Sequence, residues 1–315
     1  MNKVTLQISL APSDYKHAIH LLPHQIKIFY NQVDEILLTY DTHKSKGRFG
    51  LNWEQNNKLL WDYITEFASD KEKIRVIKID YSKQKQKEIG NKYFRLNQVP
   101  AKDWRGGPFY TYFFGLNEAK NDFVFHIDSD IFFGGKSQTW IDEALKTYHS
   151  DTKILFISPL PGPPREDSIL INQKYLPYKS KEYFFEFKQM STRLFLVSKH
   201  RLLKDGVHIE DLLTLKPREL IRAFYRKNMP YKLPELILSN FMEKKSKIRI
   251  DFLGNNEGLW SLHPPYRTEK FYEDLPILIE RVETNNLPIT QRGNYDIVDD
   301  FFDWSIAKSK LNIKQ

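Results

Sequence analysis

The chain has 315 residues, of which 41% are hydrophobic and 14% aromatic, and this composition predicts a folded globular protein. It contains no cysteine, which excludes disulfides, thiolate metal sites and a cysteine nucleophile. The formal net charge of +8 favours an anionic partner, but no nucleic-acid-binding motif accompanies it, so we expect no nucleic acid partner. Because the sequence shows neither a secretory signal nor a run of about 18 apolar residues, we expect a cytoplasmic protein.

Strand-like and helix-like segments alternate along the first half of the chain. The predicted strands are Val4–Leu10, Val33–Tyr40, Ile74–Ile79 and Phe123–Ile127. The predicted helices are residues 18–29, kinked or restarted at Pro23, and then Trp53–Phe67 and Pro108–Ala119. This alternation predicts an α/β fold with a mainly parallel central sheet flanked by helices. Ligands of such sheets bind beyond the carboxyl ends of the strands.

The second half is less regular. It contains three further strand patterns, at Lys153–Ser158, Arg193–Ser198 and Ile248–Leu253, a proline-rich loop at Pro159–Pro164, and a long basic helical pattern at Asp205–Lys232. No repeat or low-complexity linker divides the chain. We therefore expect one domain, with a regular first part at residues 1–135 and a less regular second part at residues 136–315.

The strongest chemical signal is a pair of aspartates directly after a buried strand. Asp128 and Asp130 flank Ser129 at the end of the apolar run Phe123–Ile127. On an extended chain, residues two apart point the same way, so both carboxylates could converge on one ion. Mg²⁺ and Mn²⁺ prefer oxygen ligands and retain water or substrate phosphates in their shells. The pattern therefore predicts a metal–diphosphate site, although a polar turn that closes the strand is the simpler alternative.

These features resemble the GT-A glycosyltransferases, especially those similar to glycosyltransferase family 2. The resemblance rests on a first strand that ends LQISLAPSD, a second strand that ends ILLTYD, and a fourth strand that ends in the DxD motif HIDSD. It covers residues 1–135 well and the remainder loosely, and it implies that residues 1–135 bind a nucleotide-sugar and that residues 136–315 form the acceptor-binding and C-terminal part. The aromatic residues 112–114 stand where the family usually has Ala-Arg-Asn, which leaves the donor open.

The resemblance implies a GT-A (Rossmann-like) fold and transfer of a sugar from a nucleotide diphosphate donor, with a UDP-sugar favoured. It implies that Asp130 ligates Mn²⁺ or Mg²⁺, and that Asp128 approaches the ribose or a metal-bound water, with Ser129 between them. Asp41 would then bind the nucleobase in a pocket lined by Ala11 and Pro12; capping of its own turn is an equally good alternative for Asp41.

Two further segments carry candidate donor-binding groups. In Trp104–Gly107, Arg105 could contact phosphate or sugar while Gly106 allows close backbone approach, and a plain helix-start loop is the alternative. Late in the chain, His263 and Arg267 resemble the histidine that completes the metal shell in several GT-A enzymes and the basic residue on the diphosphate. A neutral imidazole is an acceptable Mn²⁺ ligand, and a guanidinium can bind phosphate bidentately.

An inverting transfer needs a carboxylate base for the acceptor hydroxyl. Glu235 lies where the family places this acid, near the start of a late helix, and Asp211 in the pair Glu210–Asp211 is the rival. Both could instead be acids that interact favourably with a helix N-terminus. A retaining reaction would need neither as a base.

The acceptor is undetermined by sequence and could be a glycan, a lipid-linked molecule or a small molecule. Arg218, Arg222 and Arg226 recur every four residues and share a helix face, which is either a solvated face or a contact with a membrane surface. Two other functions stay open: a nucleotidyltransferase, and a sugar- or nucleotide-binding protein with a decayed transferase site. The first would be expected to have a glycine-rich loop after its first strand, where this chain has APSD.

Overall fold

The computed structural model describes residues 2–44, 50–179, 181–204 and 212–312. Its strands are β1 (Val4–Leu10), β2 (Glu35–Tyr40), β3 (Ile74–Lys78), β4 (Phe123–Asp128), β5 (Phe132–Gly134), β6 (Ile154–Pro161), β7 (Leu176–Pro177), β8 (Phe184–Phe187), β9 (Leu194–Ser198), β10 (Ile248–Phe252) and β11 (Trp260–Leu262). Its α-helices are α1 (Tyr15–Phe29), α2 (Trp53–Ala68), α3 (Lys83–Phe94), α4 (Tyr110–Glu118), α5 (Trp140–Ser150), α6 (Lys199–Lys204), α7 (Pro217–Arg226), α8 (Pro234–Lys244), α9 (Glu269–Glu283) and α10 (Ser305–Asn312).

The central sheet has the strand order β3-β2-β1-β4-β9-β6-β10-β8-β7. β1 pairs in parallel with β2 and β4, β2 with β3, and β6 with β10, while β9 runs antiparallel between β4 and β6. The strands β3, β2, β1, β4, β6 and β10 therefore share one direction. This confirms the expected α/β fold with a mostly parallel sheet.

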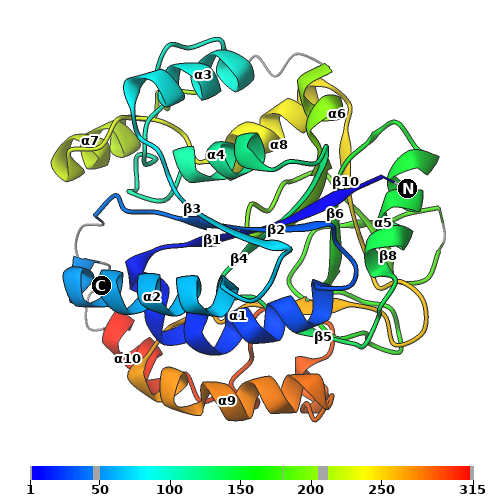
Figure 1. Ribbon diagram of the computed structural model, residues 1–315. Coiled ribbons are helices and arrows are strands. Elements are labelled where there is room, and N and C mark those ends of the chain that lie inside the picture. The colour runs from blue at the N-terminus through cyan, green and yellow to red at the C-terminus, as the bar shows by residue number, and fades with distance from the viewer. Residues whose placement is uncertain (1, 45–49, 180, 205–211, 313–315) are drawn as a thin grey trace.

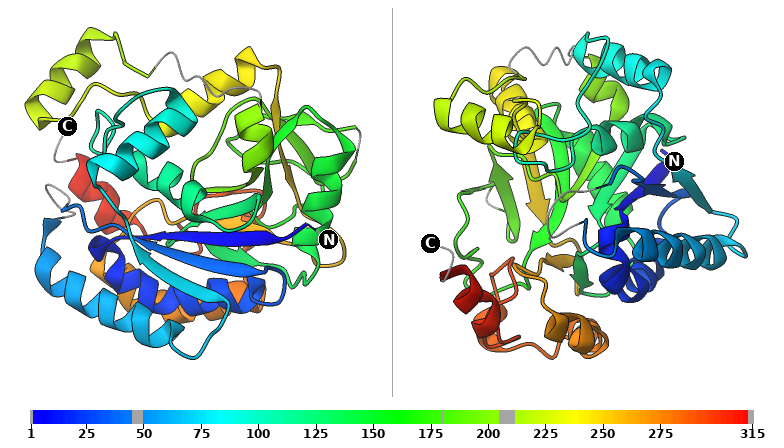
Figure 2. Two further views of the ribbon diagram at one scale, coloured as in Figure 1. Left: turned by 45° about the horizontal axis from the view of Figure 1, so that its top comes forward. Right: turned by 90° about the vertical axis from the view of Figure 1, so that its left-hand side faces the viewer.

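Helices cover both faces of the sheet (Figure 1). α1 and α2 lie on one face, with α9 beyond them, and α4 and α8 lie on the other. The side chains of β4 explain this arrangement, because Phe125 and Ile127 pack into the core beneath α1, whereas Val124 packs into the core beneath α4 and α8. A strand buried on both faces reads as a continuous apolar run. α7 stands out from the body near the carboxyl edge of the sheet (Figure 2).

α1 runs without interruption through Pro23, so the predicted kink or restart is wrong. Proline lacks the N–H that would bond the carbonyl four residues earlier, here that of Ile19. The hydroxyl of Tyr63 on α2 donates to this carbonyl at 3.0 Å and satisfies it. Packing between two helices thus compensates for the missing bond.

β6 continues through Pro159 and Pro161, which the sequence assigned to a loop. The N–H of Leu160 bonds to Leu259 at 3.2 Å, on the side of β11. Because successive strand residues point their N–H groups to opposite sides, the prolines face the side of β9, where β6 pairs only at Ile157. The N–H groups that the two prolines lack would therefore form no hydrogen bonds to a neighbouring strand.

The prediction of a single basic helix over Asp205–Lys232 is also wrong in its extent. Residues 205–211 lie outside the described part, and the described remainder forms α7 alone, from Pro217 to Arg226, followed by a loop. The sequence patterns also did not predict the described helices α3, α5, α6, α9 and α10. Among the helices that the structure describes, none is long and apolar enough to cross a membrane.

Candidate functional site

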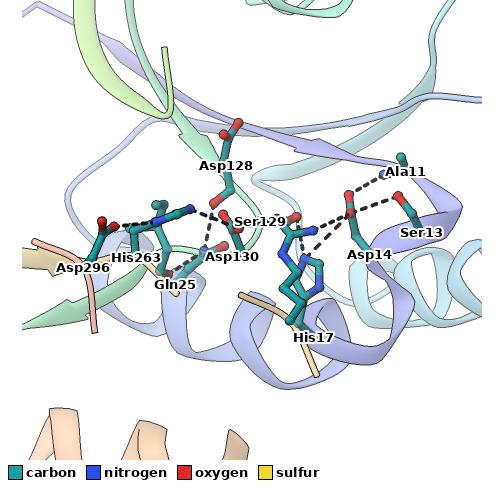
Figure 3. Close-up of polar contacts among 12 residues, drawn as sticks. Ala11, Ser13, Asp14, His17, Gln25, Asp128, Ser129, Asp130, His263 and Asp296 are labelled. Carbon is teal, nitrogen blue, oxygen red and sulfur yellow. Dashed lines mark hydrogen bonds and ion pairs between the residues drawn. The ribbon is translucent and has the colours of Figure 1, made fainter. Parts of the chain in front are cut away.

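The loop after β1 is a tight turn that positions Asp14. Pro12 is buried at the first position of a short 3-10 helix, Pro12–Asp14. The Ala11 N–H donates to Asp14 Oδ2 at 2.9 Å, and the Asp14 N–H donates to the Ala11 carbonyl at 2.8 Å. This reciprocal pair fixes the turn and turns the Asp14 carboxylate toward the end of β4 (Figure 3).

The Asp128–Asp130 turn begins at the carboxyl end of β4 and is held from α1. Gln25 donates through Nε2 to the carbonyls of Asp128 at 3.2 Å and Ile131 at 2.8 Å. The Ser129 hydroxyl lies 3.0 Å from Nε2 of His17, which is also on α1. α1 therefore supports the Asp128–Asp130 turn with two buried polar side chains that local sequence patterns do not identify.

Asp130 is buried among cationic and imidazole groups. Its Oδ2 accepts a hydrogen bond from Arg267 Nη2 and lies 3.8 Å from Nε2 of His263. Burial by itself would raise the pKa of Asp130, but the charges of Arg267, His263 and His17 outweigh it and hold the pKa well below its ordinary value. Asp130 is accordingly a carboxylate that is available to a cation.

Arg267 bridges two of these carboxylates. Besides Asp130, its Nη1 lies 3.6 Å from Oδ1 of Asp14. The pKa of Asp14 is raised to about 6, first by burial, with Arg267 acting in the opposite direction. We expected Arg267 to bind a donor diphosphate; in the structure its guanidinium neutralises the two acids that border the site.

His263 is oriented by Asp296. Its Nδ1 lies 2.8 Å from Oδ1 of Asp296, its ring stacks on Tyr295, and its backbone pairs with the chain at Tyr295 and Ile297. A carboxylate at Nδ1 favours the tautomer whose Nε2 lone pair is free, and that nitrogen faces Asp130. Histidines that ligate metals commonly have such a carboxylate partner.

Asp128 and Asp130 do not converge as the strand spacing predicted. β4 ends at Asp128, and a turn follows, so the alternation of an extended chain stops before Asp130. The Asp128 carboxylate points away from Asp130 (Figure 3) and lies 3.3 Å from Nε2 of His126. Nδ1 of His126 in turn contacts Gln7 on β1. Asp128 is thus oriented by a buried polar pair within the sheet.

Arg193 is the main charged neighbour of the aspartates that the sequence analysis missed. Its carbonyl accepts the Asp128 N–H at 2.8 Å, because β9 starts next to the end of β4. Its side chain is exposed to solvent on one side and surrounded by site residues on the other. The partial loss of water lowers the pKa of Arg193, but the charges of Tyr295, Asp130, Asp128 and Asp296 outweigh this effect and raise it. The antiparallel pairing that brings it there leaves no local sequence signal.

Asp41 follows β2, beside Ala11, because Leu10 and Tyr40 pair across the sheet. Its Oδ1 accepts from the Tyr81 hydroxyl and the His43 N–H, each at 2.8 Å, and its Oδ2 accepts from Lys102 at 3.0 Å. The structure therefore supports a role for Asp41 in its own turn and leaves one oxygen with further accepting capacity.

Arg105 and Gly106 belong to a loop organised by Asp103. Asp103 Oδ1 accepts the N–H groups of Arg105 at 2.8 Å and Gly107 at 2.9 Å. Gly106 has φ of +90°, a conformation that favours glycine. The Arg105 side chain is 52% exposed. The loop is ordered by its own hydrogen bonds, with Arg105 turned toward solvent.

Glu235 lies in the first turn of α8 and is exposed. The pKa of the buried Tyr112 hydroxyl is raised chiefly by burial and then by the charges of Asp128 and, more weakly, Glu235. Both carboxylates therefore lie within electrostatic range of one tyrosine at this end of the sheet. The rival base Asp211 lies outside the described residues.

Within the described ranges, no three His, Cys, Asp or Glu side chains are arranged to hold a metal ion by themselves. Asp130 and His263 supply two donors of suitable chemistry, a carboxylate oxygen and an oriented imidazole nitrogen. Divalent ions at phosphate-binding sites often take only one or two protein carboxylates and complete their shells with water and substrate phosphates. The pair thus fits an ion that is bound together with a phosphorylated ligand.

No protein-family model matches the chain, and no curated protein matches it by sequence. Among solved structures, GalNAc-T7 crystallised with UDP, GalNAc and Mn²⁺ superposes with a TM-score of 0.51 at 13% identity, covering 99% of this chain and 54% of that one. The chain thus spans about half the length of GalNAc-T7. The chain has the GT-A fold.

Other GT-A structures match less closely. Staphylococcus aureus TarS 1-349 in complex with UDP-GlcNAc gives a TM-score of 0.42 at 14% identity, over 82% of this chain and 58% of that one. Mouse xyloside xylosyltransferase 1 in its apo form gives a TM-score of 0.37 at 11% identity, covering 79% of this chain and 83% of that one. The GT-A fold expected from the DxD register is confirmed by the GalNAc-T7 superposition.

Proposed function

We propose that this protein is a metal-dependent glycosyltransferase that moves a sugar from a nucleotide diphosphate donor to an acceptor hydroxyl. The observation that carries the proposal is the meeting of Asp130, His263 and Arg267 at the carboxyl ends of β1 and β4 in a GT-A fold. This is the edge at which parallel sheets bind ligands.

Residues 1–135 would provide most of the donor site, and residues 136–315 the acceptor side together with His263, Arg193 and Arg267. Asp41, Ala11 and Pro12 would border the nucleobase, and Asp128 the ribose. A UDP-sugar is the favoured donor, and GalNAc-T7, the similar structure, was crystallised with UDP. Arg193 is exposed beside the aspartates, so its guanidinium can bind the diphosphate without breaking a buried ion pair.

Asp130 and His263 would hold Mn²⁺ or Mg²⁺, with Asp296 fixing the imidazole. When bound, the ion would supply positive charge against the departing diphosphate. Arg267 neutralises Asp130 and Asp14, and its guanidinium would be a second positive group for the phosphates. Its position between two acids keeps either buried carboxylate close to a positive charge.

For an inverting transfer, Glu235 is the proposed base. Its exposed carboxylate at the start of α8 can accept the proton of an acceptor hydroxyl that approaches from solvent. After burial, its charge and the larger effect of Asp128 both raise the pKa of the Tyr112 hydroxyl. Asp211 is the alternative base. The acceptor could be a glycan, a lipid-linked molecule or a small molecule.

The test is a calorimetric and thermal-shift titration of the full chain with UDP-, GDP-, dTDP- and CMP-sugars, with and without Mn²⁺. We expect one nucleotide to bind only when Mn²⁺ is present. His263→Ala should weaken this binding about 10- to 100-fold, whereas His200→Ala, an exposed histidine on α6, should not change it. Binding that ignores both Mn²⁺ and His263→Ala would contradict the proposal.

A further inference from the structure

α7 presents an apolar face to solvent. The side chains of Phe224, Tyr225 and Ile221 are 81%, 80% and 56% exposed, and Leu220 is also exposed. In ordinary amphipathic surface helices the apolar stripe faces the core. Here the buried side chain of α7 is Ala223, and the large apolar groups point outward.

A stripe of arginines adjoins this apolar face. At about 100° per residue, Arg218, Arg222 and Arg226 fall on one flank, next to Ile221 and Tyr225. All three arginines are exposed. The acidic residue of the helix, Glu219, is turned inward and contacts the Thr214 hydroxyl. The outward surface of α7 is therefore apolar on one side and cationic on the other.

The position of this helix is fixed by the backbone around it. Thr214 N–H donates to the Pro230 carbonyl at 2.8 Å, and Lys232 N–H donates to the Leu212 carbonyl at 2.7 Å, so an isolated antiparallel bridge joins the segments before and after α7. Trp104 N–H also donates to the Tyr231 carbonyl at 2.9 Å. The apolar face is thus a built feature of the fold, held against the loop that contains Arg105.

The apolar surface extends beyond the helix at both ends. Leu215 before α7 and Met229 after it are both exposed. Several large apolar side chains exposed on and beside one helix of an otherwise charged protein indicate an interaction site. We propose that α7 is a docking surface for an anionic lipid bilayer, with Phe224 and Ile221 entering the interface and the arginines contacting lipid headgroups.

Charge and shape favour a bilayer over a second copy or a protein groove. Arginines next to aromatic and aliphatic side chains are the composition of helices that lie in a membrane interface. Two copies meeting through α7 would bring their arginine stripes together and repel. The whole chain also carries a net charge of +8, which attracts it to an anionic surface.

Docking in this way would place the carboxyl edge of the sheet next to the bilayer. α7 contacts the loop of Arg105, since Arg226 Nη1 donates to the Arg105 carbonyl at 2.6 Å. α7 lies on the side of the molecule toward which β1 runs (Figure 1). The inference concerns binding alone, so it can be tested whether or not the chain transfers a sugar.

The experiment is co-sedimentation of the full chain with vesicles of phosphatidylcholine alone or with 30% phosphatidylserine (about that fraction suffices to make the surface anionic). We expect binding to the anionic vesicles only, weakening as salt rises. Arg218→Gln/Arg222→Gln should lower the partition coefficient about 25-fold, or about fivefold for each charge. Phe224→Ser/Ile221→Ser should lower it about tenfold or more.

Matched variants elsewhere on the surface serve as controls. Lys83→Gln/Lys87→Gln removes two exposed charges four residues apart on α3, and Ile277→Ser/Ile289→Ser removes apolar side chains that are 59% and 82% exposed. Both controls should bind within about twofold of the parent chain, because surface residues away from the interface contribute little. Equal losses in control and α7 variants would overturn the proposal, as would absence of vesicle binding. Self-association in sedimentation velocity that Phe224→Ser abolishes would also overturn it in favour of a second copy.

Discussion

Loss of the Arg267 guanidinium is expected to destabilise the fold more than loss of its partner Asp130. The Asp130 side chain is 2% exposed and the Arg267 side chain 30%. Arg267→Gln leaves a buried carboxylate without its main counter-charge, whereas Asp130→Asn leaves an arginine that still reaches Asp14 and water. Breaking a buried pair by removing one partner costs about 3–5 kcal/mol.

We place Arg267→Gln at the low end of that range, at about 3 kcal/mol, because His263 remains near Asp130. Asp130→Asn should cost about 1 kcal/mol, as for one lost charged hydrogen bond with a partly solvated partner. The double variant removes both charges and should cost about 2 kcal/mol, which gives a coupling energy of about 2 kcal/mol.

The assay is urea unfolding followed by circular dichroism, in metal-free buffer. With an m-value of about 3 kcal/mol/M, Arg267→Gln should lower the midpoint by about 1 M urea. Glu269→Gln, which breaks the exposed pair between Glu269 and Lys16, serves as the control and should change stability by less than about 1 kcal/mol. Additive losses in the double variant, or an unchanged midpoint for Arg267→Gln, would refute the reasoning.

Three further variants test other parts of the structure. Asp296→Ala removes the carboxylate at Nδ1 of His263 and should weaken Mn²⁺-dependent nucleotide binding about 10- to 100-fold in calorimetry with little change in stability. The hydrogen bond from His24 on α1 is the main cause that lowers the pKa of Glu283 to about 2. The stabilisation that Glu283 gives the fold is therefore present above pH 4.5 and is lost as the pH falls toward 2. Glu283→Gln should therefore lower stability at pH 7 by about 1 kcal/mol, and urea titrations should show the difference disappearing as pH falls through that window. Gly134→Ala would place a Cβ 1.9 Å from the Trp260 ring and should cost about 3 kcal/mol in thermal unfolding; a normal melting temperature would show that β11 can shift.

The sequence by itself determined the fold class and the place of the Asp128–Asp130 turn in it. Apolar runs such as Phe123–Ile127 must be buried on both faces, and their alternation with helical patterns predicts a parallel sheet. The parallel strands end at one edge, so the predicted DxD turn had to lie there. These inferences succeed because periodicity and strand polarity are local properties of the chain.

Hydrogen bonds between segments that lie far apart in the sequence could not be predicted in this way. The strand spacing predicted that Asp128 and Asp130 would converge, but β4 ends between them, held there by Gln25 on α1. Likewise, the local sequence predicted that Pro23 would break the helix. The helix continues because the Tyr63 hydroxyl on another helix bonds to the carbonyl that proline leaves without a donor.

What the tertiary structure alone decided is the set of partners around Asp130. Arg267 and His263 follow it by more than a hundred positions, and Arg193 reaches the same edge through an antiparallel strand. The motif residues carry their own chemistry, but whether a carboxylate meets an arginine, an imidazole or water depends on packing between distant segments. Hydrophobic patterning determines which faces are buried, and it carries no information about which polar groups meet at the edge of the sheet.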